Sequence, residues 1–316
     1  MPGGKKVIER NSRQRLSESA LISAIGVIFI LAGTYIPLLG LLTFFTAVPY
    51  ILITMRNGLR YGVMASVISA AAVSMFTDPI YGITLALLFF VPGVAIGYRG
   101  ISSKEPFGPV AWGFITSIVL VMVYVKLMSL VLGVDIIEKA VQMFEQAVKM
   151  QGDMISSLGQ KQAAADVGAL LEYMKLIIPG AIVVQAMLMS FFNYYLALSI
   201  LKRTRGYSGN IPKLSEFTLP GNIALGMLII YFLTMSAKGL SWINYENLVA
   251  NITFIIIFMF FIQGFAVTGY FLNKSKINKV FRNLLLFMMI FFGPLSSIVS
   301  VVGFLDSIID FRRIRK

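Results

Sequence analysis

Long, nearly uncharged apolar runs recur along the whole of this sequence. A run of about 18 apolar residues can cross the hydrocarbon core of a bilayer as one helix. Only 13% of the residues are charged, whereas a soluble domain averages about 25%. The sequence therefore predicts an all-α integral membrane protein, a bundle of about eight transmembrane helices, which we expect near residues 17–36, 41–55, 58–76, 80–98, 108–132, 174–200, 219–237 and 248–272.

A further apolar run, residues 284–305, contains Gly293 and Pro294. If this run crosses the bilayer completely, the basic tail after it ends outside the cell, against the usual distribution of Lys and Arg. If the run breaks at Gly293-Pro294 and turns back, the tail ends inside, and such re-entrant backbone has to be buried by protein. We favour the broken or re-entrant C-terminal helix, and the sequence leaves both alternatives open.

The chain is strongly basic, with 27 Lys and Arg against 14 Asp and Glu and a net charge of +13. The basic residues concentrate in the N-terminal tail (1–18) and in alternate loops such as 56–60 and 202–213. Lys and Arg accumulate in the cytoplasmic segments of membrane proteins. We therefore expect a cytoplasmic N-terminus and a multi-pass protein whose partner is the lipid bilayer, and no nucleic acid.

The sequence contains neither cysteine nor histidine. This excludes disulfides, thiol chemistry, Ser-His-Asp triads and the usual Cys/His zinc sites. The phosphate-binding pattern G-x-x-x-x-G-K-[ST] is also missing, so the chain does not carry its own ATPase of that class. We expect a protein that is not an enzyme, with no catalytic residues, no cofactor and no metal.

Small residues form strips on the expected helices. Ala20 and Ala24 lie four residues apart in the first span and so share one helix face, and Ser23 widens the strip. Such strips let helices approach closely within lipid. The neighbour is either another helix of this chain or a separate membrane protein, for which Ala20, Ala24 and Ser23 would be the docking residues. The third span has small residues at every fourth position, which should also be buried: Gly58, Gly62, Ser66, Ala70 and Ser74.

Residues 133–172 form the only long polar region between the expected spans. Apolar residues recur there at helical spacing, at Ile137, Val141, Phe144 and Val148, and the region is net acidic. We expect an external amphipathic helical pair on the outer surface. It is either a solvated cap or a lid over an outward-facing pocket.

Four polar residues near the expected bundle are ligand-binding candidates. Asp78 stands beside Tyr81 at an outer turn, where it is either a solvated turn residue or part of a cation-attracting pocket rim. Gln185 and Asn193 lie eight residues apart on roughly one face of the sixth span. Because an unsatisfied amide is costly in lipid, each makes either an interhelical hydrogen bond or a ligand contact.

Two carboxylates, Asp306 and Asp310, lie four residues apart just before Arg312 and Arg313. They either neutralise these arginines or form a paired-carboxylate site for a cation or a proton, because ionisable residues at membrane depth are often functional.

The order of these features resembles a known family. A cytoplasmic N-terminus, the A-x-x-x-A of Ala20 and Ala24, a short second segment, a small-residue third helix and a Gly-rich fourth are similar to the substrate-binding S-component of energy-coupling-factor vitamin transporters. The resemblance covers the first two thirds of the chain. It implies a six-helix domain at 1–201, whose first helix docks onto a membrane coupling protein driven by two ATPases. It also implies a pocket for a small-molecule ligand, formed by the outer halves of spans four to six and the turn after span one.

The whole chain more closely resembles the YybS-like family of uncharacterised bacterial membrane proteins. The residues that carry this resemblance are Ile211-Pro212, Leu219-Pro220 and the segment from Gly303 to Arg312. It implies a bacterial plasma-membrane location. The additional helices of residues 202–316 have no place in a six-helix S-component, and they are the intramolecular alternative for covering Ala20 and Ala24.

Two functions follow from these resemblances. The first is a non-catalytic S-component-like protein for small-molecule or vitamin uptake, energised by a separate coupling module. The second is a non-transport membrane scaffold or regulatory partner in the cell envelope.

Overall fold

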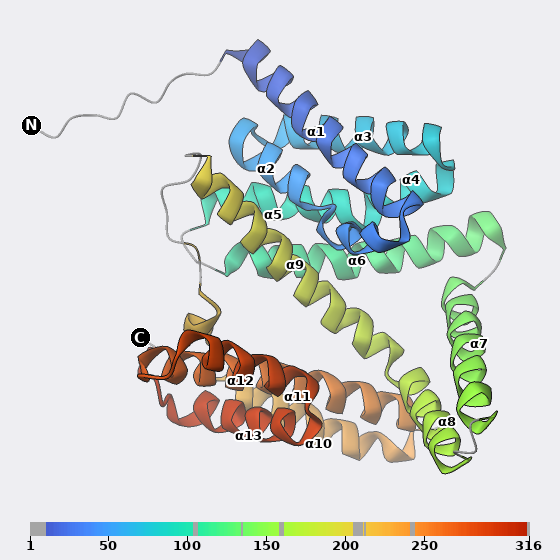
Figure 1. The fold of residues 1–316 in the computed structure, drawn as a ribbon, viewed down its shortest axis with the longest axis vertical. Helices are drawn as coiled ribbons and strands as arrows, with labels where there is room; N and C mark the ends of the chain where they lie inside the picture. Colours follow the sequence, from blue (N-terminus) through green and yellow to red (C-terminus); the bar gives the residue numbers. More distant parts are fainter. Residues whose placement is uncertain are drawn as a thin grey trace, which may run out of the picture. The chain divides into compact units, whose positions relative to one another are not determined.

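The computed structural model describes residues 11–103, 107–133, 135–157, 161–204, 211, 213–240 and 244–314, with the side chains of 155 and 161–167 left out. Every regular element in these ranges is a helix, so the predicted all-α membrane bundle is confirmed. The basic tail 1–10, Pro212, and Arg315 and Lys316 lie outside the described residues. Figure 1 labels the helices in chain order. Their bounds are α1 Ser12–Tyr35, η1 Pro37–Phe45, α2 Val48–Asn57, α3 Leu59–Phe76, α4 Pro79–Leu85, η2 Ala86–Phe90, α5 Val91–Ser102, α6 Gly108–Leu132, α7 Ile136–Ser157, α8 Lys161–Leu176, α9 Ile178–Arg203, η3 Leu214–Glu216, α10 Ile223–Ser236, η4 Ala237–Gly239, α11 Tyr245–Lys274, α12 Lys279–Phe291 and α13 Gly293–Ile309.

Within the described ranges, seven helical segments are long and apolar enough to cross a bilayer. They match the expected spans except the one at 219–237, which is a shorter apolar helix, Ile223–Gly239. Two of the seven segments are irregular. The second span begins as a 3₁₀ helix, η1, and continues as α2, and a π-helical turn, η2, interrupts the span formed by α4 and α5. Pro92 follows that turn and has no N–H to donate, which explains why the regular hydrogen-bond pattern is interrupted there.

The last apolar run is broken at the predicted place. Phe292 has extended backbone angles, Pro294 stands in the first turn of α13, and the axes of α12 and α13 differ in direction by 97°. Arg312, just after α13, donates from Nη1 to the carbonyl oxygen of Ser215 (2.9 Å) and from Nη2 to that of Phe217 (2.8 Å). The C-terminal turn therefore lies beside the loop before α10, which the charge pattern assigns to the cytoplasmic side.

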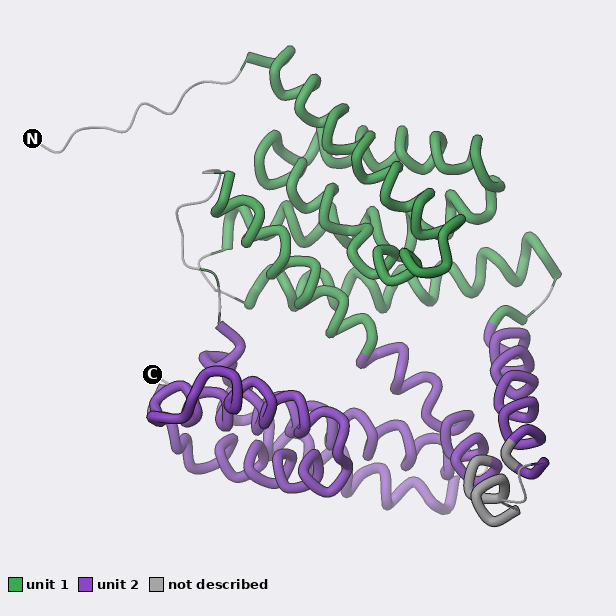
Figure 2. The backbone as a smooth tube through the Cα atoms, in the orientation of Figure 1, with its two compact units in different colours: residues 1–136, 185–211 green, residues 137–184, 212–316 purple. Residues whose placement is uncertain are grey.

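The chain forms two compact units (Figure 2). Unit 1 comprises residues 1–136 and 185–211, and unit 2 comprises residues 137–184 and 212–316, so that α9 contributes to both. Unit 1 contains α1 to α6 with the longer part of α9, and unit 2 contains α7, α8 and α10 to α13. These are units of packing, and the expected domain boundary at 201/202 stays a prediction.

The core of unit 1 is built by close approach at small residues. The Tyr50 and Phe90 rings stack with centroids 4.2 Å apart, and both side chains are fully buried. A Cβ on Gly97 would lie 2.9 Å from the carbonyl oxygen of Ile51, so α5 and α2 touch at the backbone. Of the predicted ladder, Gly62 and Ser66 are buried in α3, as expected of a small-residue interface, whereas Gly58, Ala70 and Ser74 are half-buried.

Unit 2 is centred on the crossing of α11 and α13. Gly264 and Gly303 meet there so closely that a Cβ on Gly303 would clash with the carbonyl oxygen of Phe260. Asn251 of α11 ties this centre to the α8–α9 corner, because its Nδ2 donates to Leu176 O and its Oδ1 accepts from Gly180 N (both 2.6 Å).

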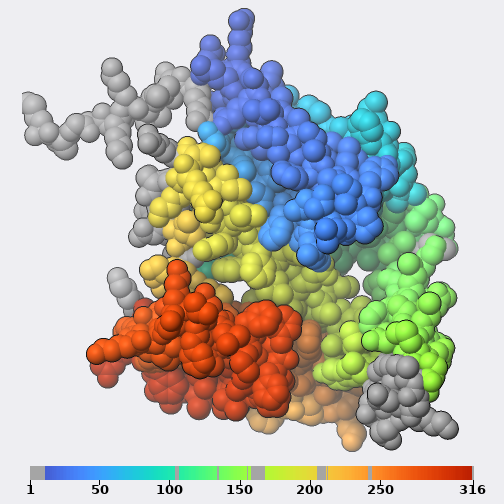
Figure 3. All heavy atoms as spheres, in the orientation of Figure 1, coloured from blue at the N-terminus to red at the C-terminus, as the bar shows by residue number. Residues whose placement is uncertain are grey.

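The space-filling view shows α12 on the surface of unit 2 (Figure 3), with Val280, Phe287 and Phe291 more than half exposed.

Candidate functional site

An apolar groove runs between α1 and α3 in unit 1. Its volume is about 450 Å³, and it includes the predicted docking residues Ala20, Ser23 and Ala24. Ala20 and Ala24 are exposed, whereas Ser23 is buried. The residues that line the groove are Leu16, Ser19, Ala20, Ser23, Ala24, Val27, Ile28 and Leu31 from α1, and Tyr61, Met64, Ala65, Ile68, Ser69, Ala72 and Phe76 from α3.

The packing of α1 inside unit 1 uses a stripe next to these two alanines. The buried residues of α1 are Ser19, Ser23, Gly26 and Ile30. A Cβ on Gly26 would lie 2.9 Å from Pro49 Cγ, which shows how closely α1 approaches α2. Ser19 Oγ also forms a 2.9 Å hydrogen bond with the side-chain amide of Asn57. Within unit 1, helix packing therefore leaves Ala20 and Ala24 as an open wall of the groove.

The N-terminal end of the groove is polar and basic. Arg56 Nη2 forms an ion pair with Glu18 Oε1 at 2.6 Å, and Asn57 Nδ2 lies 3.3 Å from Arg15 O. Arg13 and Arg60 are exposed at this end. Positive charge there matches the cytoplasmic membrane surface that the sequence predicts for it.

Asp78 and Tyr81 lie at the opposite end of unit 1. Asp78 is the N-cap of α4, and its Oδ1 accepts from Tyr81 N at 2.8 Å. Tyr81 Oη is 3.0 Å from Thr34 Oγ1 of α1. An N-cap aspartate stabilises its helix without any ligand. The geometry therefore explains Asp78 as a helix cap, and its role at a pocket rim stays a prediction.

Asn193 and Gln185 differ in environment although they belong to one helix. Asn193 is 1% exposed, and its Nδ2 donates to Phe44 O of η1 and to Met189 O, both at 2.9 Å. Gln185 is exposed. The hydrogen bond from Asn193 to a backbone oxygen is the interhelical contact expected of a buried amide.

The two C-terminal carboxylates have different partners. Asp306 is fully buried in unit 2, where its Oδ2 accepts from Arg312 Nη2 (3.1 Å) and from Gln263 Nε2 (2.6 Å). Asp310 adopts a left-handed backbone conformation (φ 51°) and its Oδ1 accepts from Ile314 N. The sequence alone did not identify Gln263. The signal was available, because it is a lone amide in the long apolar run of α11.

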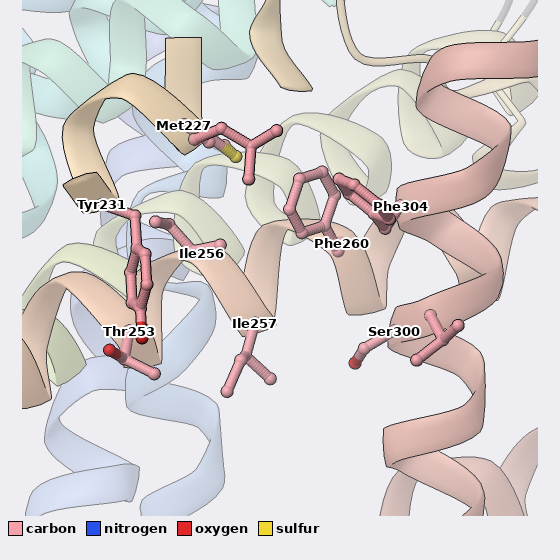
Figure 4. A pocket seen from close by; sticks show the side chains of 10 residues that line it. Met227, Tyr231, Thr253, Ile256, Ile257, Phe260, Ser300 and Phe304 are labelled. Atoms are coloured by element: carbon pink, nitrogen blue, oxygen red, sulfur yellow. The ribbon is translucent and has the colours of Figure 1, made fainter. Parts of the chain in front are cut away.

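A second pocket, of about 320 Å³, lies among α10, α11 and α13 in unit 2. The close-up shows Tyr231 and Thr253 on one side of it and Ser300 and Phe304 on the other (Figure 4). Phe260 and Phe304 pack edge to face with centroids 5.2 Å apart. The lining of this pocket is mostly aliphatic and aromatic, which suits an apolar occupant.

Comparison with known proteins gives the family. A family model described as "Predicted membrane protein (DUF2232)" matches residues 24–307. The chain belongs to this family of predicted membrane proteins. It is 25% identical over 305 residues to "Uncharacterized protein YybS" of Bacillus subtilis (strain 168), an alignment that covers 92% of this chain and 95% of that protein. No solved structure matches the chain.

The DUF2232 match confirms the predicted YybS-like family and the multi-pass membrane character. The matched residues include Ala24 of the groove together with Gln263 and Asp306, whereas Arg312 lies outside them. Ala20 lies just before the matched residues. The likeness to S-components stays a prediction.

Proposed function

We propose that this chain is a non-catalytic membrane protein of S-component type, which binds a small molecule for uptake and is energised by a separate coupling module in the bacterial plasma membrane. The observation that carries the proposal is the open α1–α3 groove, in which Ala20 and Ala24 are exposed.

The shape and chemistry of the groove support a helix as its occupant. Two helices form the walls of the groove, and its lining is apolar. Ala20, Ala24, Ala65 and Ala72 have small side chains, which leave room for another helix. Small residues let a partner helix approach the backbone, where van der Waals packing drives association in lipid. Unit 1 also has six membrane-spanning segments, counting α9, as the S-component resemblance implies.

A test of this proposal is purification of the full chain from a bacterial membrane in a mild detergent. We expect a polytopic membrane protein and two ATPases to co-purify at a fixed ratio. We also expect one compound of a vitamin panel to raise the melting temperature, because a ligand that binds only the folded protein stabilises it. Purification without ATPases together with a flat response across the panel would overturn the proposal.

A membrane scaffold or regulatory partner in the cell envelope is the second candidate. One observation favours it: in this structure Asp78 caps a helix and Asn193 binds the backbone of η1, so two of the four polar candidates already have structural roles. Co-purification dominated by envelope proteins, with no ATPase, would support this candidate against the first.

A further inference from the structure

Helix α7 carries an apolar seam that is exposed in the described part of the structure except at its first residue, Ile136, which is half-buried. Its residues follow one another at alternating spacings of three and four, which is the heptad pattern of a helix that pairs with another helix. Met143, Met150 and Met154 are 66%, 74% and 63% exposed, and the alanines between them are exposed as well. The seam consists of Ile136, Ala140, Met143, Ala147, Met150 and Met154.

The remaining apolar residues of α7 occupy a different face. Val141, Phe144 and Val148 are half-buried, and Glu145 on the same side binds Lys175 of α8, with Oε1 and Nζ 2.6 Å apart. These three apolar residues belong to the helical pattern from which the sequence predicts an amphipathic helix on the outer surface. The methionines and alanines of the seam lie on another face, which the described residues of unit 2 leave exposed.

The seam is complementary to itself when a second α7 runs antiparallel. In an antiparallel pair centred on residues 145 and 146, Ala140 meets Met150 of the other copy and Ala147 meets Met143. Met154 then meets Ile136. Each small residue opposes a large one, so that both helices can approach closely without leaving voids. A parallel pair would place alanine against alanine and methionine against methionine.

The flanking charges favour the same arrangement. Lys139 and Asp153 border the seam on the same side, one near each end. In the antiparallel pair each Lys139 lies opposite Asp153 of the other copy, so two attractive contacts form, whereas a parallel pair would place the two copies of Lys139 on opposite sides of the seam and would form no such contact. Opposite charges at such flanking positions set the orientation of paired helices.

The membrane permits this pairing only if α7 lies along its surface. Two copies in one membrane are related by a two-fold axis along the membrane normal. The two-fold axis of an antiparallel helix pair is perpendicular to both helices, so the paired helices have to lie parallel to the membrane surface. Within unit 2, α7 runs across the direction of the membrane-spanning α11 (Figure 1), and its surface is exposed in the space-filling view (Figure 3). If α11 crosses the bilayer, α7 therefore lies along its surface.

We propose that two copies of this protein associate through their α7 helices, which pair antiparallel by the seam of alanines and methionines outside the membrane. This interface is separate from the α1–α3 groove, so its failure would leave the proposed function untouched.

Cysteine cross-linking of the full chain in native membranes tests the proposal, because the protein contains no cysteine of its own. Gln146→Cys lies beside its own symmetry mate, and we expect a short bifunctional thiol reagent to link it into dimers. In the antiparallel pair, the two copies of residue 139 are about 21 Å apart along the helix. Lys139→Cys alone and Asp153→Cys alone should therefore give no dimer, while the double variant Lys139→Cys/Asp153→Cys should give one.

Lys149→Cys, exposed and away from the seam, is the matched control and should give only background. Adding Ala147→Glu to Gln146→Cys places an unpaired carboxylate opposite Met143, and we expect the dimer to weaken by at least about tenfold. Linking by Lys139→Cys alone that is as efficient as linking by the double variant would contradict the antiparallel pair and overturn the proposal. It would equally be overturned if Gln146→Cys stayed at background while Met143→Cys were shielded from a charged maleimide, since the seam would then face lipid.

Discussion

Asp306 and Arg312 form an ion pair whose two side chains have no solvent-exposed surface, with Oδ2 and Nη2 3.1 Å apart. Gln263 joins this pair to α11 and also accepts from Leu219 N with its Oε1 at 2.9 Å. Arg312 completes the cluster through the carbonyl oxygens of Ser215 and Phe217. The buried ion pair and its hydrogen bonds thus connect the C-terminal turn to α11 and to the segment before α10.

Removing one member of this pair should destabilise unit 2 strongly. Asp306→Ala leaves the guanidinium of Arg312 buried without its counter-charge, and breaking a buried pair costs about 3 to 5 kcal/mol. The double variant Asp306→Leu/Arg312→Leu removes both charges and should be less destabilised than Asp306→Ala. Unfolding in detergent by denaturant measures these differences, and a double variant that is no better than the single one would contradict this view of the pair.

The contact of Gly303 with α11 predicts a large effect of a single methyl group. Gly303→Ala should force α13 away from the carbonyl oxygen of Phe260 and lower the melting temperature. Gly226→Ala in α10 is the matched control, because nothing lies within 4 Å of the added Cβ. Alanine favours a helix over glycine by about 0.5 to 1 kcal/mol, so this variant should melt at the same temperature or higher. Equal losses in both variants would refute the close crossing.

The amide of Asn193 should contribute to the stability of unit 1. Asn193→Ala removes the bond to Phe44 O, and polar contacts between membrane helices contribute about 0.6 to 2 kcal/mol. Gln185→Ala, at an exposed position of the same helix, should change the unfolding free energy by less than about 0.5 kcal/mol. Denaturant titration of the two variants side by side compares them, and a larger loss for Gln185→Ala would be inconsistent with the structure.

The ion pair between α7 and α8 predicts a pH dependence. The hydrogen bond from Lys175 holds the pKa of Glu145 below its ordinary value of 4.5, and the hydrogen bond to Glu145 raises the pKa of Lys175 above its ordinary 10.5. The carboxylate stabilises this contact above pH 4.5 and ceases to do so as the pH falls through its lowered pKa. The ammonium stabilises it below pH 10.5, and this contribution is lost as the pH rises through the raised pKa.

A spin label at Gln142→Cys, an exposed position of α7, reports the order of this helix across this range and leaves in place Lys149, whose charge also lowers the pKa of Glu145. It should be immobile between about pH 5 and pH 10 and become mobile on acidification. With Glu145→Gln added, the label should lose its acid transition. An unchanged acid transition in that variant would assign the effect to another group.

The membrane spans could be predicted from the sequence because lipid demands long, uncharged helices with every backbone group bonded internally. The break at Gly293-Pro294 was also predictable, since proline cannot donate the helical hydrogen bond. The 3₁₀ helix η1 was not predicted, because it depends on how neighbouring helices pack rather than on apolar periodicity. The π-helical turn η2 was also missed, although Pro92 just after it carries the signal.

The site was predictable only in part. The strip of Ala20 and Ala24 was recognisable from its spacing, but the pattern does not say which small residues are used inside the fold. The structure uses Ser23 and Gly26 for that purpose and leaves the two alanines exposed. Likewise, the spacing of Asp306 and Asp310 suggested a pair of carboxylates that act together. In the structure Asp306 instead binds Arg312 and Gln263.

The most direct test of the central claim is the effect of Ala20→Leu/Ala24→Leu on the fold and on partner binding, measured on one preparation. Leucines at these exposed positions fill the α1–α3 groove without displacing the buried stripe of α1. We predict an unchanged melting temperature in detergent together with loss of the co-purifying membrane protein and its ATPases. A double variant that keeps those partners at the wild-type ratio, or that unfolds, would contradict the account.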